Sequence, residues 1–366
     1  MSGGLDIVIF GLTISSSWGN GHATLWRGLV RALTAQGHHI TFFERDQSFY
    51  AQARDVSAIE GGRLTIYADF ADVRDPARRA MTAADVVIIT SYCPDALEAE
   101  RMAQDARGLR VFYDLDAPVT LARLERGELI AYIGAHGLAD YDCVLSYTGG
   151  RAMNLLRSRL GARAVWPLYG HVDPAIHAPG AATEAYRADL SYLGTYAQDR
   201  QAALEQLFVA PARALPQRSF LIGGAQYPAD FPWSPNIYFV RHLPPAQHPA
   251  FYASSRLTLN VTRRDMAALG WCPSGRLFEA AACGACLVSD AWEGLDAFFT
   301  PGVDILIARD SADIGDALEV DDAQLRAIAQ AGRARVLERH SSAQRARDMV
   351  GIFEQARRAC AQATEA

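Results

Sequence analysis

The chain has 366 residues, of which 50% are hydrophobic and 21% are charged. At roughly 150 residues per domain, this length accommodates about two domains, each able to bury a core of its own. The 35 basic residues against 41 acidic ones give a net charge of −6. This balance argues against a nucleic-acid-binding protein, because such domains usually carry a basic patch.

Every basic residue in the chain is arginine, and lysine is absent. This absence excludes a Walker-type P-loop, a pyridoxal Schiff base and a Schiff-base aldolase, since each of them needs a lysine amine. Anions must therefore be bound by arginine side chains, by backbone N–H groups and by helix N-termini.

The apolar runs are too short to span a bilayer, because none approaches ~18–20 residues. The residues after Met1 do not resemble a signal peptide, and six cysteines in so long a chain do not make a disulfide framework. We therefore expect a cytoplasmic protein. The arginine-rich end of the chain makes the inner face of the membrane a second, peripheral location.

Short apolar runs alternate with helical stretches through the first half of the chain. The predicted strands are 5–12, 39–44, 64–67, 85–90, 110–114 and 143–147. The first predicted helix, 23–36, carries Leu25, Leu29 and Leu33 on one face. Continuous apolar strands separated by helices indicate a parallel sheet covered on both faces.

A proline-rich stretch interrupts this pattern and predicts a linker over residues 169–188, after a first domain over 1–168. The alternation restarts in a second domain over 189–340. Its predicted strands are 190–193, 220–222, 238–240, 257–261, 286–289 and 305–307, and its predicted helices are 199–208 and 276–282. The end of the chain, from residue 322 to 361, is expected to be helical. We expect its last part, 341–366, to form a separate helix. One arrangement of this helix is a crossing back to the first domain.

This order predicts an α/β protein of two doubly wound, Rossmann-like domains. In such folds a ligand binds at the carboxyl ends of the strands, so we expect a cleft between the two domains.

The first loop, residues 11–22, follows a strand and precedes a helix without the G-x-G-x-x-G dinucleotide pattern. Its small residues, including Asn20 and Gly21, allow a substrate to approach the backbone. His22 at the helix start is either a base or hydrogen-bond donor for the substrate, or a solvated capping residue. We favour the former, because loops at strand ends carry function.

Two carboxylates, Asp114 and Asp116, stand at the end of another predicted strand and point the same way. Asp116 is equally consistent with a general base and with a helix cap before Pro118. For Asp114 we favour the capping role.

The second domain opens with a strand, a glycine turn and a helix, which together favour a phosphate near Gly194, Tyr196 and Arg200. A turn beside a surface arginine is the plainer interpretation.

A further helix starts near Ser274, whose hydroxyl group could bind a diphosphate together with the guanidinium groups of Arg263 and Arg276. Glu279, one turn further, suits two hydrogen bonds with ribose hydroxyls. An exposed pair with Arg276 is the alternative. We favour the ribose role, because the helix is apolar and a buried carboxylate needs partners.

Cys283 and Cys286 have C-x-x-C spacing without a second pair, so we expect a tight turn and no metal or cofactor.

At these residues the chain resembles the GT-B glycosyltransferases. Residues 166–174 resemble their "P-N-G-V-D" hinge, and residues 276–284 resemble their donor-binding "E-A-x-A-C-G" helix, which places Glu279 on the ribose-binding glutamate. More closely, the chain resembles the CgeB-like (spore maturation protein-like) glycosyltransferases. The similar stretches are 113–120, 146–150, 190–200, 259–266 and 273–284.

The resemblance implies metal-independent transfer of a hexose-type sugar from a nucleoside diphosphate sugar, UDP-linked or similar, to a hydroxyl group. The acceptor is a saccharide, a lipid-linked glycan, a protein or a small molecule, and its class is open. Retaining relatives carry Glu-x7-Glu, but Trp271 occupies the first position here, so the sugar and the stereochemistry are also open. A nucleotide-sugar 2-epimerase and a catalytically silent nucleotide-sugar-binding protein are the alternatives.

Overall fold

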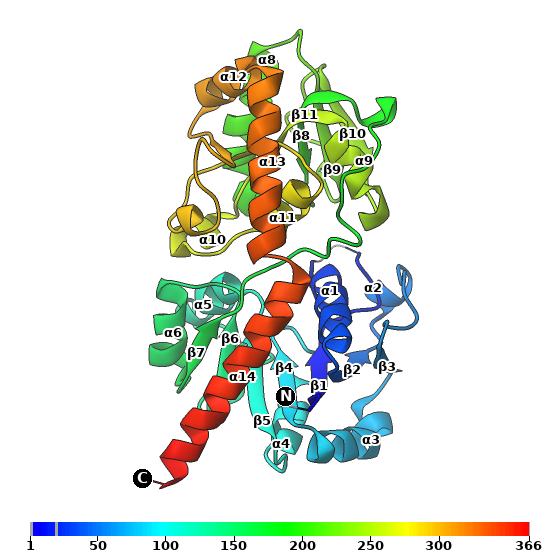
Figure 1. The fold of residues 1–366 in the computed structure, drawn as a ribbon, viewed down its shortest axis with the longest axis vertical. Coiled ribbons are helices and arrows are strands. Elements are labelled where there is room, and N and C mark those ends of the chain that lie inside the picture. The colour runs from blue at the N-terminus through cyan, green and yellow to red at the C-terminus, as the bar shows by residue number, and fades with distance from the viewer. Residues whose placement is uncertain (1–2, 19–20, 366) are drawn as a thin grey trace. The chain divides into compact units, whose positions relative to one another are not determined.

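The computed structural model describes residues 3–18 and 21–365, which form two compact units. Unit 1 comprises Met1–Tyr169 together with Ser342–Ala366, and unit 2 comprises Gly170–Ser341. Each unit is built around its own parallel sheet (Figure 1). The expected α/β architecture of two doubly wound domains is therefore confirmed for the sheets.

The sheet of unit 1 has seven strands in the order β3-β2-β1-β4-β5-β6-β7, and all its pairs are parallel. The strands are β1 (Asp6–Gly11), β2 (His39–Arg45), β3 (Gly62–Tyr67), β4 (Val86–Thr90), β5 (Leu109–Asp114), β6 (Cys143–Ser146) and β7 (Val165–Pro167). The central strands are buried on both faces, which explains their continuous apolar sequences.

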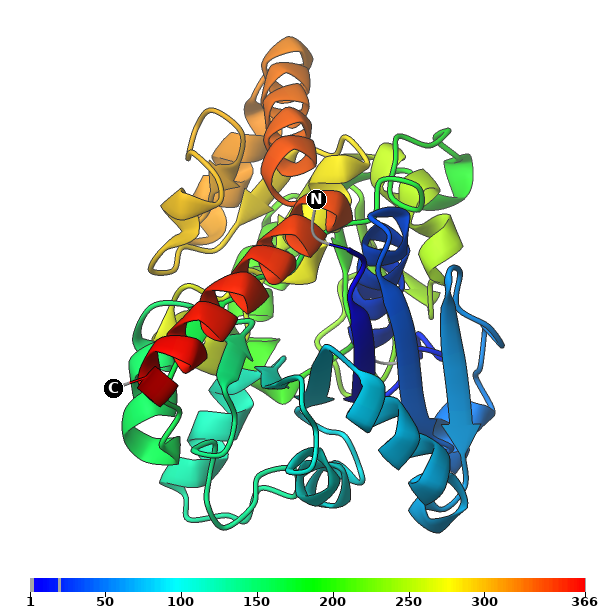
Figure 2. The same cartoon turned by 60° about the horizontal axis from the view of Figure 1, so that its bottom comes forward.

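Helices cover the sheet of unit 1, and two of them from opposite ends of the chain lie side by side. These are α1 (His22–Ala35) and α14 (Ser342–Glu365), the latter drawn in red (Figures 1 and 2). Trp26 of α1 and Phe353 of α14 are fully buried in one core with Phe42 and Tyr113 of the strands. The remaining helices are α2 (Ser48–Ala51), α3 (Phe70–Ala83), α4 (Ala96–Ala103), α5 (Ala117–Glu125) and α6 (Arg151–Leu160). The last helix of the chain is thus part of the unit that the first residues build.

The sheet of unit 2 has six strands in the order β10-β9-β8-β11-β12-β13, again all parallel. The strands are β8 (Ala188–Leu193), β9 (Phe220–Gly224), β10 (Ile237–Arg241), β11 (Ser255–Asn260), β12 (Leu287–Ser289) and β13 (Leu306–Ile307). The α-helices are α7 (Gln201–Leu204), α8 (Ala210–Ala214), α9 (His248–Ala253), α10 (Arg264–Leu269), α11 (Gly275–Ala282), α12 (Ser311–Glu319) and α13 (Asp322–Arg339). A π-helical turn (Glu205–Val209) joins α7 to α8.

Residues 170–188, where the sequence predicts a linker, pack within unit 2. The backbone N–H of Val172 donates to the carbonyl oxygen of His340, and His177 is 1% exposed. The helical end of the chain, predicted over 322–361, is broken at His340 and Ser341. Helix α13 ends at Arg339, and α14 begins at Ser342.

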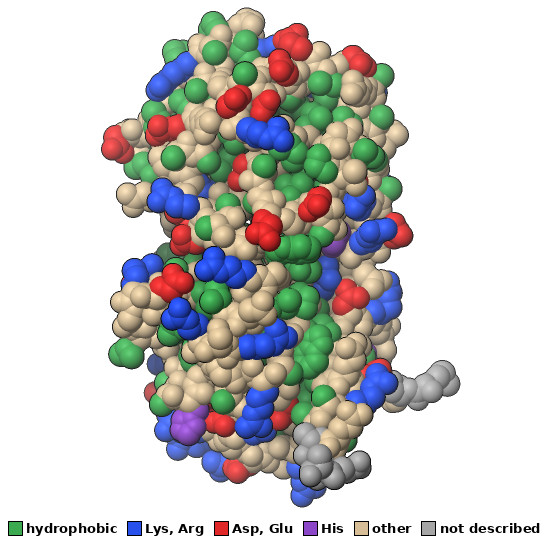
Figure 3. Space-filling model, turned by 90° about the vertical axis from the view of Figure 1, so that its left-hand side faces the viewer, with side chains coloured by type: hydrophobic (Ala, Val, Ile, Leu, Met, Phe, Trp, Pro, Cys, Tyr) green, Lys and Arg blue, Asp and Glu red, His purple; other side chains and the backbone are tan. Residues whose placement is uncertain are grey.

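The surface carries both signs of charge. Figure 3 shows arginine and acidic side chains interspersed over the face in view, with no continuous basic field there. Within 3–18 and 21–365, no helix combines the length and the apolar character needed to cross a membrane.

A buried carboxylate, that of Glu44 at the end of β2, fixes the loop that follows β1. It accepts hydrogen bonds from the hydroxyl group of Thr13 at 3.0 Å and from the backbone N–H groups of Ile14 at 2.7 Å and Ser15 at 2.9 Å. The hydroxyl group of Ser15 donates to the same carboxylate. Since Glu44 is 1% exposed, these donors supply the partners that a buried charge requires. The loop before α1 is therefore held in one conformation.

We expect Glu44→Ala to lower the free energy of unfolding by about 3 kcal/mol, because it leaves two buried N–H groups without an acceptor. Urea unfolding followed by circular dichroism measures this. The control is Glu60→Ala, which removes an exposed carboxylate paired with Arg31 and should change stability by less than about 0.5 kcal/mol. Equal losses in the two variants would show that the Glu44 hydrogen bonds do not hold the loop.

Candidate active site

In each unit the polar residues singled out by the sequence lie at one edge of the sheet, here called the carboxyl edge because the strands end there. Parallel strands bring their following loops together at this edge, where doubly wound proteins bind ligands. In unit 2 the loops after β8, β9 and β11 meet there, and in unit 1 the loops after β1, β4 and β5 do so.

At the carboxyl edge of unit 2, the Arg276 guanidinium contacts residues that follow or end two different strands. Its carbon atom lies 5.0 Å from the centre of the Tyr192 ring, a cation–π contact, and its Nη1 donates to the side-chain oxygen of Asn260 at 3.3 Å. A Cβ atom on Gly194 would lie 2.6 Å from Arg276 Nη2, so a side chain at this position would displace the guanidinium from where it stands. The structure therefore brings Gly194 and Arg276 together, as the sequence predicts for two donor-binding residues.

Arg200 reaches the same place from the turn after β8. Its Nη1 donates to the carbonyl oxygen of Thr195 at 3.1 Å and to the hydroxyl group of Tyr192 at 3.4 Å. Tyr192 thus contacts two guanidinium groups. Tyr196 lies slightly further along the loop, with its ring centre 5.7 Å from that of Tyr227.

Arg263 and Ser274 are placed differently. The Nε of Arg263 donates to the carboxylate of Asp199 at 2.8 Å, so part of its charge is already balanced within unit 2. Ser274 is the N-cap residue of α11, yet its side chain makes no capping hydrogen bond. Its hydroxyl group is therefore not occupied by the helix N-terminus.

Glu279 lies in the middle of α11, partly buried, beside two imidazoles. One ligand-type atom of each of Glu279, His177 and His248 lies within 4.8 Å of the others. Burial lowers the pKa of His177 and of His248 to about 4, so both rings are neutral at pH 7. The expected alternative, an ion pair with Arg276, is not formed between these two described residues. Burial and the Glu279 charge raise the pKa of Tyr252 well above its ordinary value.

In unit 1 the structure brings His22 and Asp116 together through Tyr92. The rings of His22 and Tyr92 meet edge to face with centres 5.8 Å apart, and the Tyr92 hydroxyl donates to the Asp116 carboxylate at 3.1 Å. Tyr92 has a φ of 64°, a left-handed conformation that costs a bulky residue about 1–2 kcal/mol. Burial lowers the pKa of His22 to about 4, so its ring is neutral at pH 7.

The capping roles considered for the two aspartates are not what the structure shows. Asp116 is the N-cap residue of α5, but its side chain makes no capping hydrogen bond. Asp114 is fully buried, and its Oδ1 accepts from the backbone N–H of Asp116 at 3.1 Å and from the Thr120 hydroxyl at 3.2 Å. Its Oδ2 has no hydrogen-bond partner among the described residues. Burial raises the pKa of Asp114 to about 7.

Several residues at these edges were missed from the sequence. Tyr192, Tyr92 and Asn260 read as ordinary strand or loop residues, and His177 and His248 carry no motif. Only their positions next to strand ends or prolines could have drawn attention to them. Of the two predicted loop residues, Gly21 is the exposed N-cap of α1, and Asn20 lies outside the described residues.

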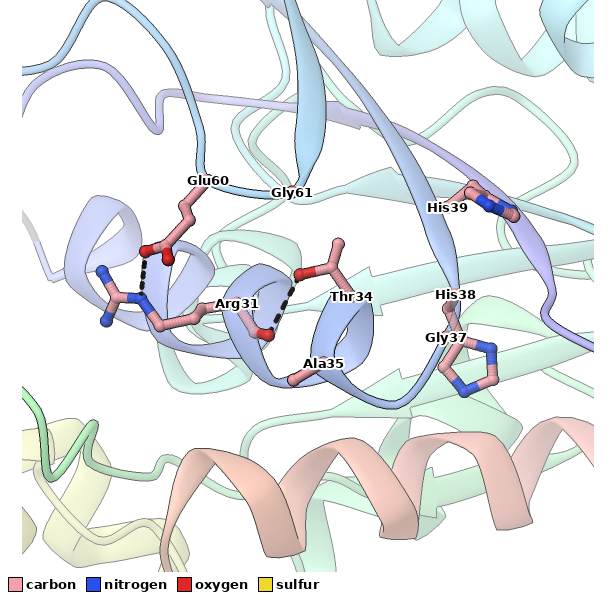
Figure 4. Close-up of a pocket in the computed structure, with 8 residues that line it drawn as sticks. All are labelled: Arg31, Thr34, Ala35, Gly37, His38, His39, Glu60 and Gly61. Carbon is pink, nitrogen blue, oxygen red and sulfur yellow. Dashed lines mark hydrogen bonds and ion pairs between the residues drawn. The ribbon is translucent and has the colours of Figure 1, made fainter.

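A separate hollow of about 380 Å³ lies at the opposite edge of the unit 1 sheet (Figure 4). Its lining includes Arg31, whose Nε lies 2.8 Å from Oε2 of Glu60, and Thr34, whose hydroxyl donates to the Arg31 carbonyl oxygen. It is bordered by the start of β2 and the end of α1, so none of the predicted site residues faces it.

Residues 200–351, which include most of the carboxyl edge of unit 2, match a family model described as glycosyl transferase-like. No curated protein matches the chain significantly.

Solved structures match over nearly the whole chain. A sucrose-phosphate synthase from Thermosynechococcus elongatus has 16% identity and a TM-score of 0.70 and covers 96% of this chain and 99% of its own. Anabaena HepE, solved with UDP and glucose, has 11% identity and a TM-score of 0.67. The match covers 96% of this chain and 100% of HepE. An α-glucosyltransferase solved with UDP and DNA has 12% identity and a TM-score of 0.67, and the match covers 96% of this chain and 100% of that structure.

These matches define the class of the fold. The chain has the two Rossmann-like α/β units of the GT-B glycosyltransferases. The glycosyl transferase-like match lies in the second half of the chain, where the predicted donor-binding residues stand.

We expect Asp114 to make stability depend on pH. The folded protein holds its proton up to about pH 7, whereas the unfolded chain releases it near the ordinary pKa of 3.8. The folded state therefore loses stability as the pH rises through this interval, by up to about 1.4 kcal/mol per pH unit. Asp114→Asn cannot ionise and should lack this loss.

Urea unfolding of wild type and Asp114→Asn at several pH values between 4 and 8 measures the effect. The difference in unfolding free energy should move in favour of the variant up to about pH 7 and then stay constant. Parallel pH profiles would contradict the assignment.

Proposed function

We propose that the protein is a glycosyltransferase that moves a hexose-type sugar from a nucleoside diphosphate sugar, UDP-linked or similar, to a hydroxyl acceptor. One observation carries the proposal: the Arg276 guanidinium, in the first turn of α11, makes a cation–π contact with Tyr192 at the carboxyl edge of unit 2. The glycosyl transferase-like match over residues 200–351 includes Arg276 and α11, and neighbours of the same fold were solved with UDP.

The chemistry needs positive charge where Arg276 stands. Cleavage of the bond between the anomeric carbon and the diphosphate oxygen develops negative charge on the leaving diphosphate. Arg276, Arg200 and the α11 N-terminus with the Ser274 hydroxyl would stabilise this charge increasingly toward the transition state. Arginine can do this without a metal ion, so we propose metal-independent transfer and no cofactor.

Glu279 is proposed to bind the ribose of the donor. A carboxylate accepts hydrogen bonds from two adjacent hydroxyl groups, and Glu279 lies one turn beyond Arg276 on the same helix. Arg263 is assigned a supporting role, since Asp199 already balances part of its charge.

Unit 1 is proposed to bind the acceptor through the residues around Tyr92. The neutral His22 ring or the Asp116 carboxylate would orient the acceptor hydroxyl or take its proton. Within the GT-B class, we propose the CgeB-like group for this chain and a cytoplasmic reaction. Both rest on the sequence resemblance and composition described above.

The direct test follows UDP release and the fate of the sugar when the protein is given UDP-glucose, with and without candidate saccharide acceptors. A transferase releases UDP in an acceptor-dependent way. Conversion of the sugar without an acceptor, while it is still attached to UDP, would identify an epimerase. The absence of any conversion, over a panel of donors first selected by thermal shift, would identify a binding protein.

Two variants separate the donor-binding roles. Arg276→Ala should reduce kcat by about 10²–10³-fold and weaken UDP binding less, because its contribution grows in the transition state. Glu279→Ala should weaken UDP binding by about 10–100-fold in calorimetry, as expected for lost charge-assisted hydrogen bonds.

The control for both is Arg213→Ala, an exposed arginine of unit 2 that contacts the Pro232 carbonyl oxygen and should leave both quantities unchanged. Equal effects of Arg276→Ala on kcat and on binding would assign it ground-state binding alone. An unchanged UDP affinity in Glu279→Ala would remove Glu279 from the nucleotide site.

A further inference from the structure

We propose that His177, His248 and Glu279 form a zinc site in unit 2. The three residues come from separate segments: the stretch before β8, the first residue of α9, and the middle of α11. All three belong to the same compact unit, so the site does not depend on how the two units are placed. One nitrogen of each histidine and one carboxylate oxygen of Glu279 lie within 4.8 Å of one another.

The distance between the two imidazoles fits two ligands of one ion. Nε2 of His177 and Nδ1 of His248 are 3.3 Å apart. In a tetrahedral site with Zn–N bonds of about 2.0–2.1 Å, two ligating nitrogens lie about 3.3–3.4 Å from each other. The two rings therefore already have the spacing that a shared zinc ion requires.

His248 is oriented as a metal-binding histidine is. Its Nε2 lies 3.3 Å from the carbonyl oxygen of Leu243. Because a carbonyl oxygen only accepts hydrogen bonds, Nε2 must carry the proton, which leaves a lone pair on Nδ1 of the neutral ring. A backbone carbonyl that fixes the far nitrogen is a common outer partner of zinc-bound histidine.

His177 is 1% exposed, and its Nδ1 has no hydrogen-bond partner among the described residues. If Nδ1 carries the proton, the lone pairs of His177 and His248 face each other and repel. If Nε2 carries it, a hydrogen bond forms to His248 but a bare lone pair is left buried on Nδ1. A cation between the two rings, with the proton on Nδ1, removes the repulsion and uses both facing lone pairs, while the Nδ1–H group has no acceptor among the described residues.

The set of two imidazoles and one carboxylate selects zinc over calcium or magnesium, which prefer oxygen ligands. Three protein ligands leave a fourth position open for water. A Glu279 carboxylate bound to zinc is less able to accept hydrogen bonds from ribose. Zinc should therefore oppose nucleotide binding, and this last step alone rests on the proposed function.

The first experiment measures zinc binding to the untagged full-length chain by competition with a chromophoric chelator. Wild type should bind zinc, and His248→Gln and Glu279→Gln should each weaken binding by at least about 10–100-fold. His39→Gln is the control, because that side chain is 78% exposed and belongs to unit 1, whereas the cluster belongs to unit 2; this variant should bind zinc as wild type does. No zinc uptake by wild type, or equal affinity in all variants, would overturn the proposal.

X-ray absorption of the zinc-loaded wild type tests the ligands without any substitution. We expect nitrogen and oxygen neighbours with the signature of two imidazoles. Sulfur neighbours would place the zinc on cysteine and overturn the assignment.

The second experiment measures UDP affinity by calorimetry with and without saturating zinc. Zinc should weaken UDP binding to wild type and leave UDP binding to His248→Gln unchanged. If UDP does not bind at all in the absence of zinc, the proposed function fails while the chelator titration still decides the zinc site. If zinc binds at the cluster and UDP affinity is unchanged, the antagonism is wrong.

Discussion

The arrangement at the carboxyl edge of unit 2 depends on one contact, the cation–π contact between the Arg276 guanidinium and the Tyr192 ring. A chain without lysine has to hold anions with guanidinium groups, which are planar, weakly hydrated and suited to stacking on aromatic rings. Tyr192 is 1% exposed at the end of a central strand, so its ring gives Arg276 a rigid support. Gly194 provides the space that the guanidinium occupies. A cation fixed in this way can face an anion without a large entropy loss on binding.

In both units the polar residues of interest lie in the loops that follow parallel strands. Parallel strands end at one edge, and the loops that follow adjacent strands supply polar groups that the sheet itself cannot accommodate. In unit 1 the Glu44 carboxylate satisfies the buried donors of the first loop, whereas Oδ2 of Asp114 has no hydrogen-bond partner among the described residues. The satisfied donors fix the backbone of the first loop. Tyr92, whose hydroxyl group donates to Asp116, has a left-handed backbone just after β4.

Glu279 connects two kinds of chemistry in unit 2. Its position on α11, one turn after Arg276, suits a nucleotide, while its neighbours His177 and His248 suit a metal ion. A carboxylate has only two oxygens, so occupancy by one ligand reduces what is left for the other. In the two proposals made above, Glu279 serves both ligands, so zinc and the sugar donor would compete for it.

Trp271 stands at the first position of the Glu-x7-Glu pattern, eight residues before Glu279, and the loop around it explains its placement. Its φ is 50°, its backbone N–H donates to the Glu293 carbonyl oxygen at 2.6 Å, and its ring lies where a Cβ atom on Gly294 would stand. Trp271 is thus held by the loop before β13 rather than presented like a carboxylate.

The sequence by itself indicated the two-sheet α/β class and most of the strands, although not β7 (Val165–Pro167), and it singled out Gly194, Arg200, Arg276 and Glu279 as candidates for donor binding. These follow from apolar periodicity and from residues placed next to strand ends, both of which are local properties. It did not reveal that Tyr192 supports Arg276, that Tyr92 joins His22 to Asp116, or that two distant histidines meet Glu279. The capping interpretation of Asp114 and Asp116 failed for the same reason. Which side chains meet is set by how helices pack on a finished sheet, and only the tertiary structure decides this.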